Sequence, residues 1–96
     1  MDQTRNPQLI LEYTRRGADA VGKYYADTVP PAAHSTMMEY IRAHYPMGYE
    51  SLQDIVPIID RYDISVDTHK KELARWVNGW KQLITKATQA WRKANK

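Results

Sequence analysis

The sequence contains no cysteine and no phenylalanine, and its four glycines are scattered. Without cysteine there can be no disulfide framework, no thiolate zinc site and no thiol nucleophile, a composition that fits a reducing compartment. The glycines form no phosphate-binding loop, and Ser35, Ser51 and Ser65 lack the flanking glycines of a hydrolase nucleophile. We therefore expect a protein that is not an enzyme.

Metal-binding patterns are missing as well. The three histidines lie in three different segments with no His-Glu-x-x-His pair: His34, His44 and His69. Asp60, Asp63 and Asp67 resemble part of an acidic calcium loop, but the glycine at the bend and the closing glutamate are absent. We expect these side chains to serve in caps and turns, and we expect neither a metal nor a cofactor.

Long apolar runs are also absent. No stretch approaches the roughly 18–20 consecutive apolar residues that span a bilayer, and the first residues, MDQTRNPQ, are too polar for a secretory signal. The hydrophobic fraction of 43% and the charged fraction of 26% are typical of globular proteins. We expect a single domain over residues 1–96 that folds in the cytoplasm and makes no use of a membrane.

Apolar residues recur at helical spacing along the chain and predict an all-α fold, a four-helix bundle. Asn6 and Pro7 form a helix start, since Asn caps free amides and Pro tolerates the first helical position. The segment Pro46-Met47-Gly48 is typical of a turn. The predicted helices cover residues 7–28, 32–45, 54–62 and 67–95.

The last predicted helix is long, amphipathic and basic. A glycine such as Gly79 destabilises a helix interior by about 1 kcal/mol. Burial of Trp76 and Trp80 stabilises the helix by more than this, so we expect one continuous helix. About 28 residues make a rod of about 42 Å, longer than a compact chain of this size is wide. Either the first helix lies along this rod or a second copy of the chain covers the end near Trp91, which would make a homodimer.

Positive charge is concentrated in this last helix, although the whole chain carries only +3. Residues 1–48 hold five basic and five acidic side chains. Residues 49–67 hold one basic and five acidic side chains, and residues 68–96 hold eight basic side chains and one acidic side chain. At about 100° per residue the basic side chains fall opposite the apolar ones. The basic arc contains Lys70, Lys71, Arg75, Lys81, Lys86, Arg92 and Lys93.

A face that serves only solubility usually mixes glutamate among its lysines, because pairs of opposite charge stabilise a helix. An arc of one sign repels itself and favours an anionic partner, most often a phosphate backbone, otherwise an acidic protein groove or an anionic membrane. Burial of the tryptophans in the core of the fold disfavours the membrane.

The stretch IIDRYDISVDTHKKELARWV resembles the helix-turn-helix DNA-binding segment. Its apolar pair, its turn, the threonine that opens the second helix and the later aliphatic anchor stand at residues 58–59, 63–65, Thr68 and Leu73. Two residues depart from the pattern: an aspartate replaces the usual glycine of the turn, and His69 stands where an aliphatic residue packs. The resemblance implies that the residues facing the major groove are Val66, Asp67, Lys70, Lys71 and Arg75.

Two functions remain open. The first is a small nucleic-acid-binding protein, in its more specific form a DNA-binding regulator, that uses the basic arc. The alternative is a protein-interaction module, such as a phage- or plasmid-type inhibitor or adaptor that binds a nucleic-acid-handling protein. Tyrosine and methionine are adaptable interface residues. The candidate protein interface therefore consists of Met37, Tyr40, Tyr45 and Tyr49.

Overall fold

The computed structural model of the chain describes residues 6–52 and 65–95. Within these two ranges all regular structure is helical, which confirms the all-α class. The elements are α1 (Pro7–Thr28), the 3₁₀ helix η2 (Pro31–Ala33), α2 (Met37–His44), α3 (Pro46–Ser51) and α5 (Val66–Ala94). The helix predicted over residues 54–62 lies outside the described residues.

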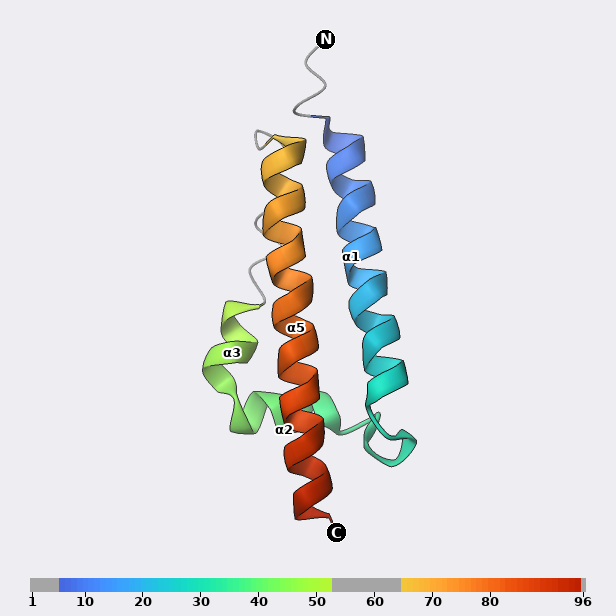
Figure 1. The fold of residues 1–96 in the computed structure, drawn as a ribbon, viewed down its shortest axis with the longest axis vertical. Helices are drawn as coiled ribbons and strands as arrows, with labels where there is room; N and C mark the ends of the chain where they lie inside the picture. The colour runs from blue at the N-terminus through green and yellow to red at the C-terminus, as the bar shows by residue number, and fades with distance from the viewer. Residues whose placement is uncertain (1–5, 53–64, 96) are drawn as a thin grey trace.

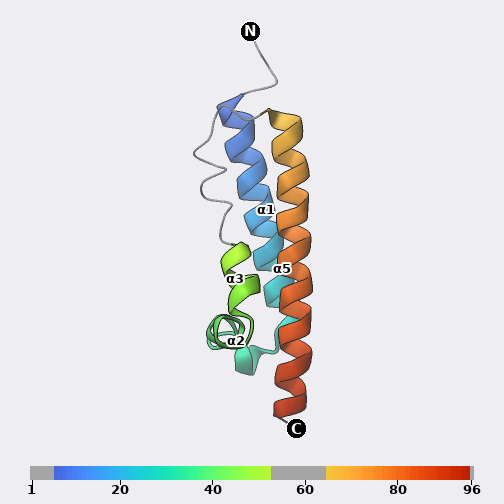
Figure 2. The same cartoon turned by 90° about the vertical axis from the view of Figure 1, so that its left-hand side faces the viewer.

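The two long helices, α1 and α5, lie side by side and run in the same direction (Figures 1 and 2). At the lower end of α1 the chain crosses through η2 and α2, and α3 then runs back along α5. The molecule is elongated, with extents of 57 × 24 × 18 Å. The first helix therefore lies along the basic one, as one of the two predicted arrangements has it, and α5 extends past it at the C-terminal end.

Helix α1 begins and ends where the sequence predicts. The side chain of Asn6 accepts hydrogen bonds from the backbone amides of Gln8 and Leu9, and Pro7 occupies the first turn. The helix ends at Thr28, because the next residue, Val29, is extended and two prolines follow.

The predictions for residues 32–51 are wrong in two respects. The second helix begins only at Met37, because Pro31–Ala33 forms a 3₁₀ turn. The chain then bends at Tyr45 alone (φ −132°, ψ 56°), and Pro46–Ser51 forms α3 where a turn was predicted. Pro46 is compatible with this helix because it stands in the first turn, where its missing amide hydrogen is not needed.

Helix α5 is continuous over 29 residues, as predicted. Ser65 caps it by accepting a hydrogen bond from the amide of Thr68. Gly79 serves a close approach: a Cβ atom there would come within 2.6 Å of Cδ2 of Leu52. The indole nitrogens of Trp76 and Trp80 both donate to the carbonyl of Leu52, so the end of α3 is fixed against this point of α5.

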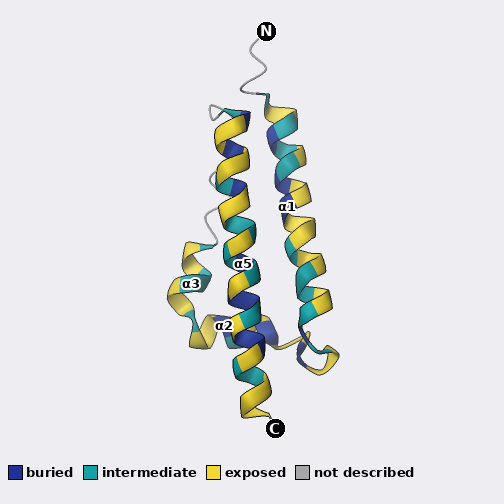
Figure 3. Ribbon diagram, viewed as in Figure 1, coloured by how far each residue is buried: buried dark blue, intermediate teal, exposed yellow. Residues whose placement is uncertain are grey.

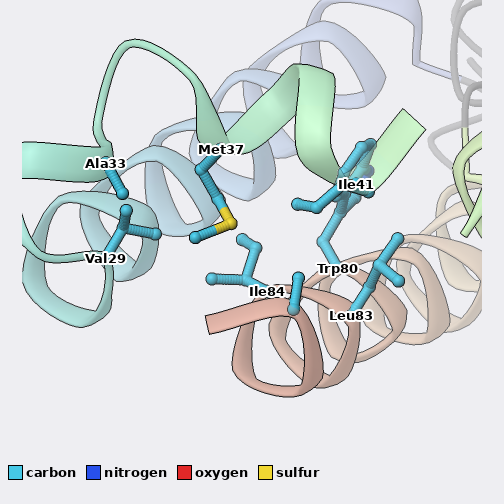
Figure 4. Packing of buried hydrophobic residues seen from close by; sticks show 8 residues of the cluster. Val29, Ala33, Met37, Ile41, Trp80, Leu83 and Ile84 are labelled. Carbon is cyan, nitrogen blue, oxygen red and sulfur yellow. The ribbon is translucent and has the colours of Figure 1, made fainter. Parts of the chain in front are cut away.

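The core lies where α2 crosses α5. Met37 and Ile41 of α2 point toward Trp80 and Ile84 of α5 (Figure 4), and Met37 and Ile41 are fully buried. The buried cluster consists of Val29, Ala33, Met37, Ile41, Trp80, Leu83, Ile84 and Ala87. Trp76 and Trp91 are half-buried against it. All three indoles thus pack on the protein's own core.

A buried polar pair joins α1 to α5 near their N-terminal ends. The hydroxyl of Thr14 donates to the carbonyl of Ile10 at 2.8 Å, so it accepts from Nε2 of His69, also at 2.8 Å. Nδ1 of His69 is buried and has no hydrogen-bond partner among the described residues. Burial lowers the pKa of His69, an effect partly opposed by the carbonyl of Ile10 and by Glu72. Burial therefore favours the neutral imidazole.

This histidine makes stability depend on pH. Between the ordinary pKa of about 6.5 and the lower pKa of folded His69, the unfolded chain binds a proton that the folded chain does not, so the free energy of unfolding falls as the pH falls through this range. The slope from this group is at most about 1.4 kcal/mol per pH unit. Urea unfolding between about pH 7.5 and pH 5 measures it. In His69→Leu the slope between about pH 6.5 and pH 5 should be reduced, and an unchanged slope would contradict this assignment.

Candidate nucleic-acid interface

One side of α5 is exposed along the full length of the helix (Figure 3). Six of the seven predicted binding residues are exposed there, namely Lys70, Lys71, Arg75, Lys86, Arg92 and Lys93, and Lys81 is half-buried. The opposite side contains the residues that the helix buries: Val66, His69, Leu73, Trp80, Leu83, Ile84, Ala87 and Thr88. We call the seven basic residues the cationic face.

The cationic face is compensated by few negative charges. Helix α5 carries seven Lys or Arg side chains but only Asp67 and Glu72 as carboxylates. Residues 6–52 carry four Lys or Arg and five Asp or Glu, so that part of the molecule is nearly balanced. Across residues 6–52 and 65–95, the one ion pair within 4.0 Å joins Arg16 to Glu12, both on α1. No cation of α5 is therefore paired with a described carboxylate.

The cationic face continues onto the seam between α5 and α1. Nζ of Lys70 lies 4.6 Å from the ring centroid of Tyr13, and Nζ of Lys81 lies 5.6 Å from that of Tyr24. Neither tyrosine was predicted from the sequence, because all of the predicted binding residues for nucleic acid lie in the last helix. The signal that could have found them is a common spacing: each pair of residues, on its own helix, is 11 positions apart.

The implication of the helix-turn-helix resemblance fails at one residue. Val66 is buried with 8% of its surface exposed, so it does not face outward. Asp67, Lys70, Lys71 and Arg75 are exposed as the resemblance implies. Residues 58–64, which include the apolar pair and the first two residues of the turn, lie outside the described residues, and Ser65, the last residue of the turn, caps α5.

The predicted tyrosine and methionine interface is largely part of the core. Met37 is fully buried and does not contribute to a surface, which corrects the prediction for that residue. Tyr40, Tyr45 and Tyr49 are half-buried against the core cluster, and the ring of Tyr49 meets that of Trp80 edge to face at 6.0 Å. The exposed methionines are their neighbours Met38 and Met47, at 39% and 84%.

Next to Met38 an apolar hollow of about 390 Å³ lies between α1, α2 and α5. Its walls include Val21, Met38, Trp76 and Trp80. The hydroxyl of Tyr25, also in the wall, donates to the carbonyl of His34, and burial raises the pKa of this tyrosine, with a smaller opposing effect from the backbone of Met38. The hollow thus offers contact area but few free polar groups.

Within the two described ranges, no three or more His, Asp or Glu side chains lie close enough together to hold a metal ion. None of the described helices combines the length and the apolar character needed to cross a bilayer. No protein-family model, no curated protein and no solved structure matches the chain.

Proposed function

We propose that the chain is a small non-enzymatic protein of the cytoplasm that binds nucleic acid through the cationic face of α5. The observation that carries the proposal is the single sign of this face: seven cations, none paired with a described carboxylate, along one uninterrupted helix. A helix of 29 residues is about 43 Å long, slightly more than one turn of a DNA duplex at 34–36 Å. The four-helix bundle and the homodimer stay predictions.

The mode of binding follows from the chemistry of the side chains. Lysine ammonium groups act as point charges on phosphate oxygens, and Arg75 and Arg92 can donate two parallel hydrogen bonds to one phosphate. Each contact releases counterions condensed on the nucleic acid, and this release drives association. Contacts of this kind fix the protein on the backbone and select no base sequence.

Affinity should therefore depend steeply on salt. With five to seven phosphates neutralised, log K for a duplex is expected to fall with log salt concentration at a slope of about −4 to −6. Fluorescence anisotropy of a labelled mixed-sequence oligonucleotide between about 50 and 200 mM salt measures this slope. Absence of binding at the lowest salt, or an affinity that salt leaves unchanged, would contradict the proposal.

The apolar hollow beside Met38 favours a second function, the protein-interaction module. In that function an apolar side chain of a nucleic-acid-handling protein would enter the hollow, and the cationic face would serve solubility or compete for the partner's nucleic-acid site. The two proposals differ in one direct result. Under the first proposal the purified protein binds nucleic acid without any other protein. Under the second proposal it does not.

A further inference from the structure

Two hollows on the seam between α1 and α5 share four equivalent positions; the first is also lined by Leu73 and Val77, and the second by Gln82 and Lys86. The first, of about 340 Å³, contains Tyr13 of α1 and Lys70, Ala74 and Asn78 of α5. The second, of about 360 Å³, contains the residues 11 positions further along each helix: Tyr24, Lys81, Thr85 and Gln89. We call them the upper and lower seam sites.

The repetition is a consequence of parallel helices. Eleven residues make slightly more than three turns, so positions i and i+11 lie on the same face, separated by about 16.5 Å along the axis. Because α1 and α5 run in the same direction, a step of 11 residues moves along both helices by the same distance and in the same sense (Figure 1). The contact of Tyr13 with Lys70 is therefore reproduced by Tyr24 with Lys81.

Each seam site combines three chemical groups. An aromatic ring forms one wall, an ammonium group lies over it, and a carboxamide from Asn78 or Gln89 lies beside them. In the lower site the hydroxyl of Tyr24 is hydrogen-bonded to Oγ1 of Thr85, and this bond fixes the orientation of the ring. A ring for stacking, a cation for phosphate and an amide for a base edge are the groups that recognise a nucleotide.

We propose that the two seam sites bind unstacked bases of a single-stranded nucleic acid. Lys70 and Lys81 swing off the rings of Tyr13 and Tyr24 to hold the phosphates of the strand, and each ring then stacks on a base. Asn78 and Gln89 hydrogen-bond to base edges. This inference rests on the proposed function and names its substrate class. Arg92, 11 residues beyond Lys81, continues the line of cations past the end of α1, so there the strand is held by phosphate contact alone.

The geometry favours a single strand over a duplex. In a duplex both faces of each base are covered by neighbouring bases, so no face is open to a tyrosine ring. The separation of about 16.5 Å also equals about five stacked base pairs at 3.4 Å, which is half a turn of B-DNA. After half a turn a given strand lies on the far side of the duplex, whereas a single strand can follow a straight seam.

The test compares a labelled mixed-sequence strand of about 15 nucleotides, a length within the range of single-strand sites, with its duplex and with a strand of abasic sites. Anisotropy at low salt should show the intact strand bound at least about tenfold more tightly than either. Replacing both rings by Tyr13→Leu and Tyr24→Leu should weaken single-strand binding by about 100-fold. Duplex binding should change by no more than about threefold, because only the ring contacts of Lys70 and Lys81 are lost there. The matched control, Tyr13→Phe with Tyr24→Phe, keeps both rings and loses only the hydrogen bond from Tyr24 to Thr85, so it should bind the strand within about threefold of the unmodified protein.

Two outcomes overturn the inference while the proposed function stands: the abasic strand and the duplex are bound as tightly as the intact strand, or the leucine variant binds the intact strand normally. In both cases binding still depends on salt. If the unmodified protein binds none of the three nucleic acids at low salt, the proposed function itself is contradicted. The abasic strand needs no substitution, so the inference remains testable even if circular dichroism shows that the leucine variant does not fold.

Discussion

A variant with Arg75, Lys86 and Lys93 all changed to Glu will bind a mixed-sequence duplex about 100- to 1000-fold more weakly than the unmodified protein. The three residues are exposed and lie within about 20° of one another around α5, so they form one stripe of the cationic face. Each loses a phosphate contact worth about 1 kcal/mol or more and gains a repulsion. Anisotropy with a labelled oligonucleotide at constant salt measures the loss.

The matched control separates the stripe from the overall charge. Arg15, Lys23 and Arg42 are also exposed, but they lie on α1 and α2, where basic and acidic residues are mixed. Changing them to Glu alters the net charge by the same six units, from +3 to −3. We expect this control to weaken binding by less than about tenfold, since only long-range attraction is lost. Equal losses in the two variants would show that net charge alone drives binding and would contradict the assignment to α5.

The two long helices could be predicted from the sequence because their signals are local. Asn6 with Pro7 and Ser65 specify the helix starts through their own side chains, and each helix has enough residues for its apolar period to be evident. Helices α2 and α3 have eight and six residues, too few for such a period. Whether Pro46 ends one helix or begins the next is decided by packing on α5, and packing has no local signal.

The site divides in the same way. The cationic face follows from the angle between successive residues of a single helix, so it could be predicted before any tertiary contact was known. Which of Met37 and Met38 faces the core could not be predicted. Adjacent residues on a helix are about 100° apart, and on a short helix either of them could point toward the core. The seam sites need the parallel pairing of α1 with α5, which joins residues more than 50 positions apart.

Ile41→Ala is expected to lower the free energy of unfolding by about 2–5 kcal/mol. Ile41 is fully buried in the cluster that joins α2 to α5, so removing its side chain loses buried apolar surface and leaves a cavity. Helix α2 cannot compensate, because eight residues are too few for a stable isolated helix and Thr36 at its start makes no side-chain capping bond. Urea unfolding followed by far-UV circular dichroism measures the change.

Met38→Ala is the matched control, because it removes a side chain of similar size three positions earlier on the same helix, where 39% of the residue's surface is exposed. Its effect should be below about 1 kcal/mol. Equal losses in the two variants would mean that Ile41 is not the residue that attaches α2 to α5. Because α2 carries none of the cationic face, folded Ile41→Ala protein should keep the salt slope of the unmodified protein. A changed slope would imply that α2 orients the cations of α5, an effect on binding that is distinct from stability.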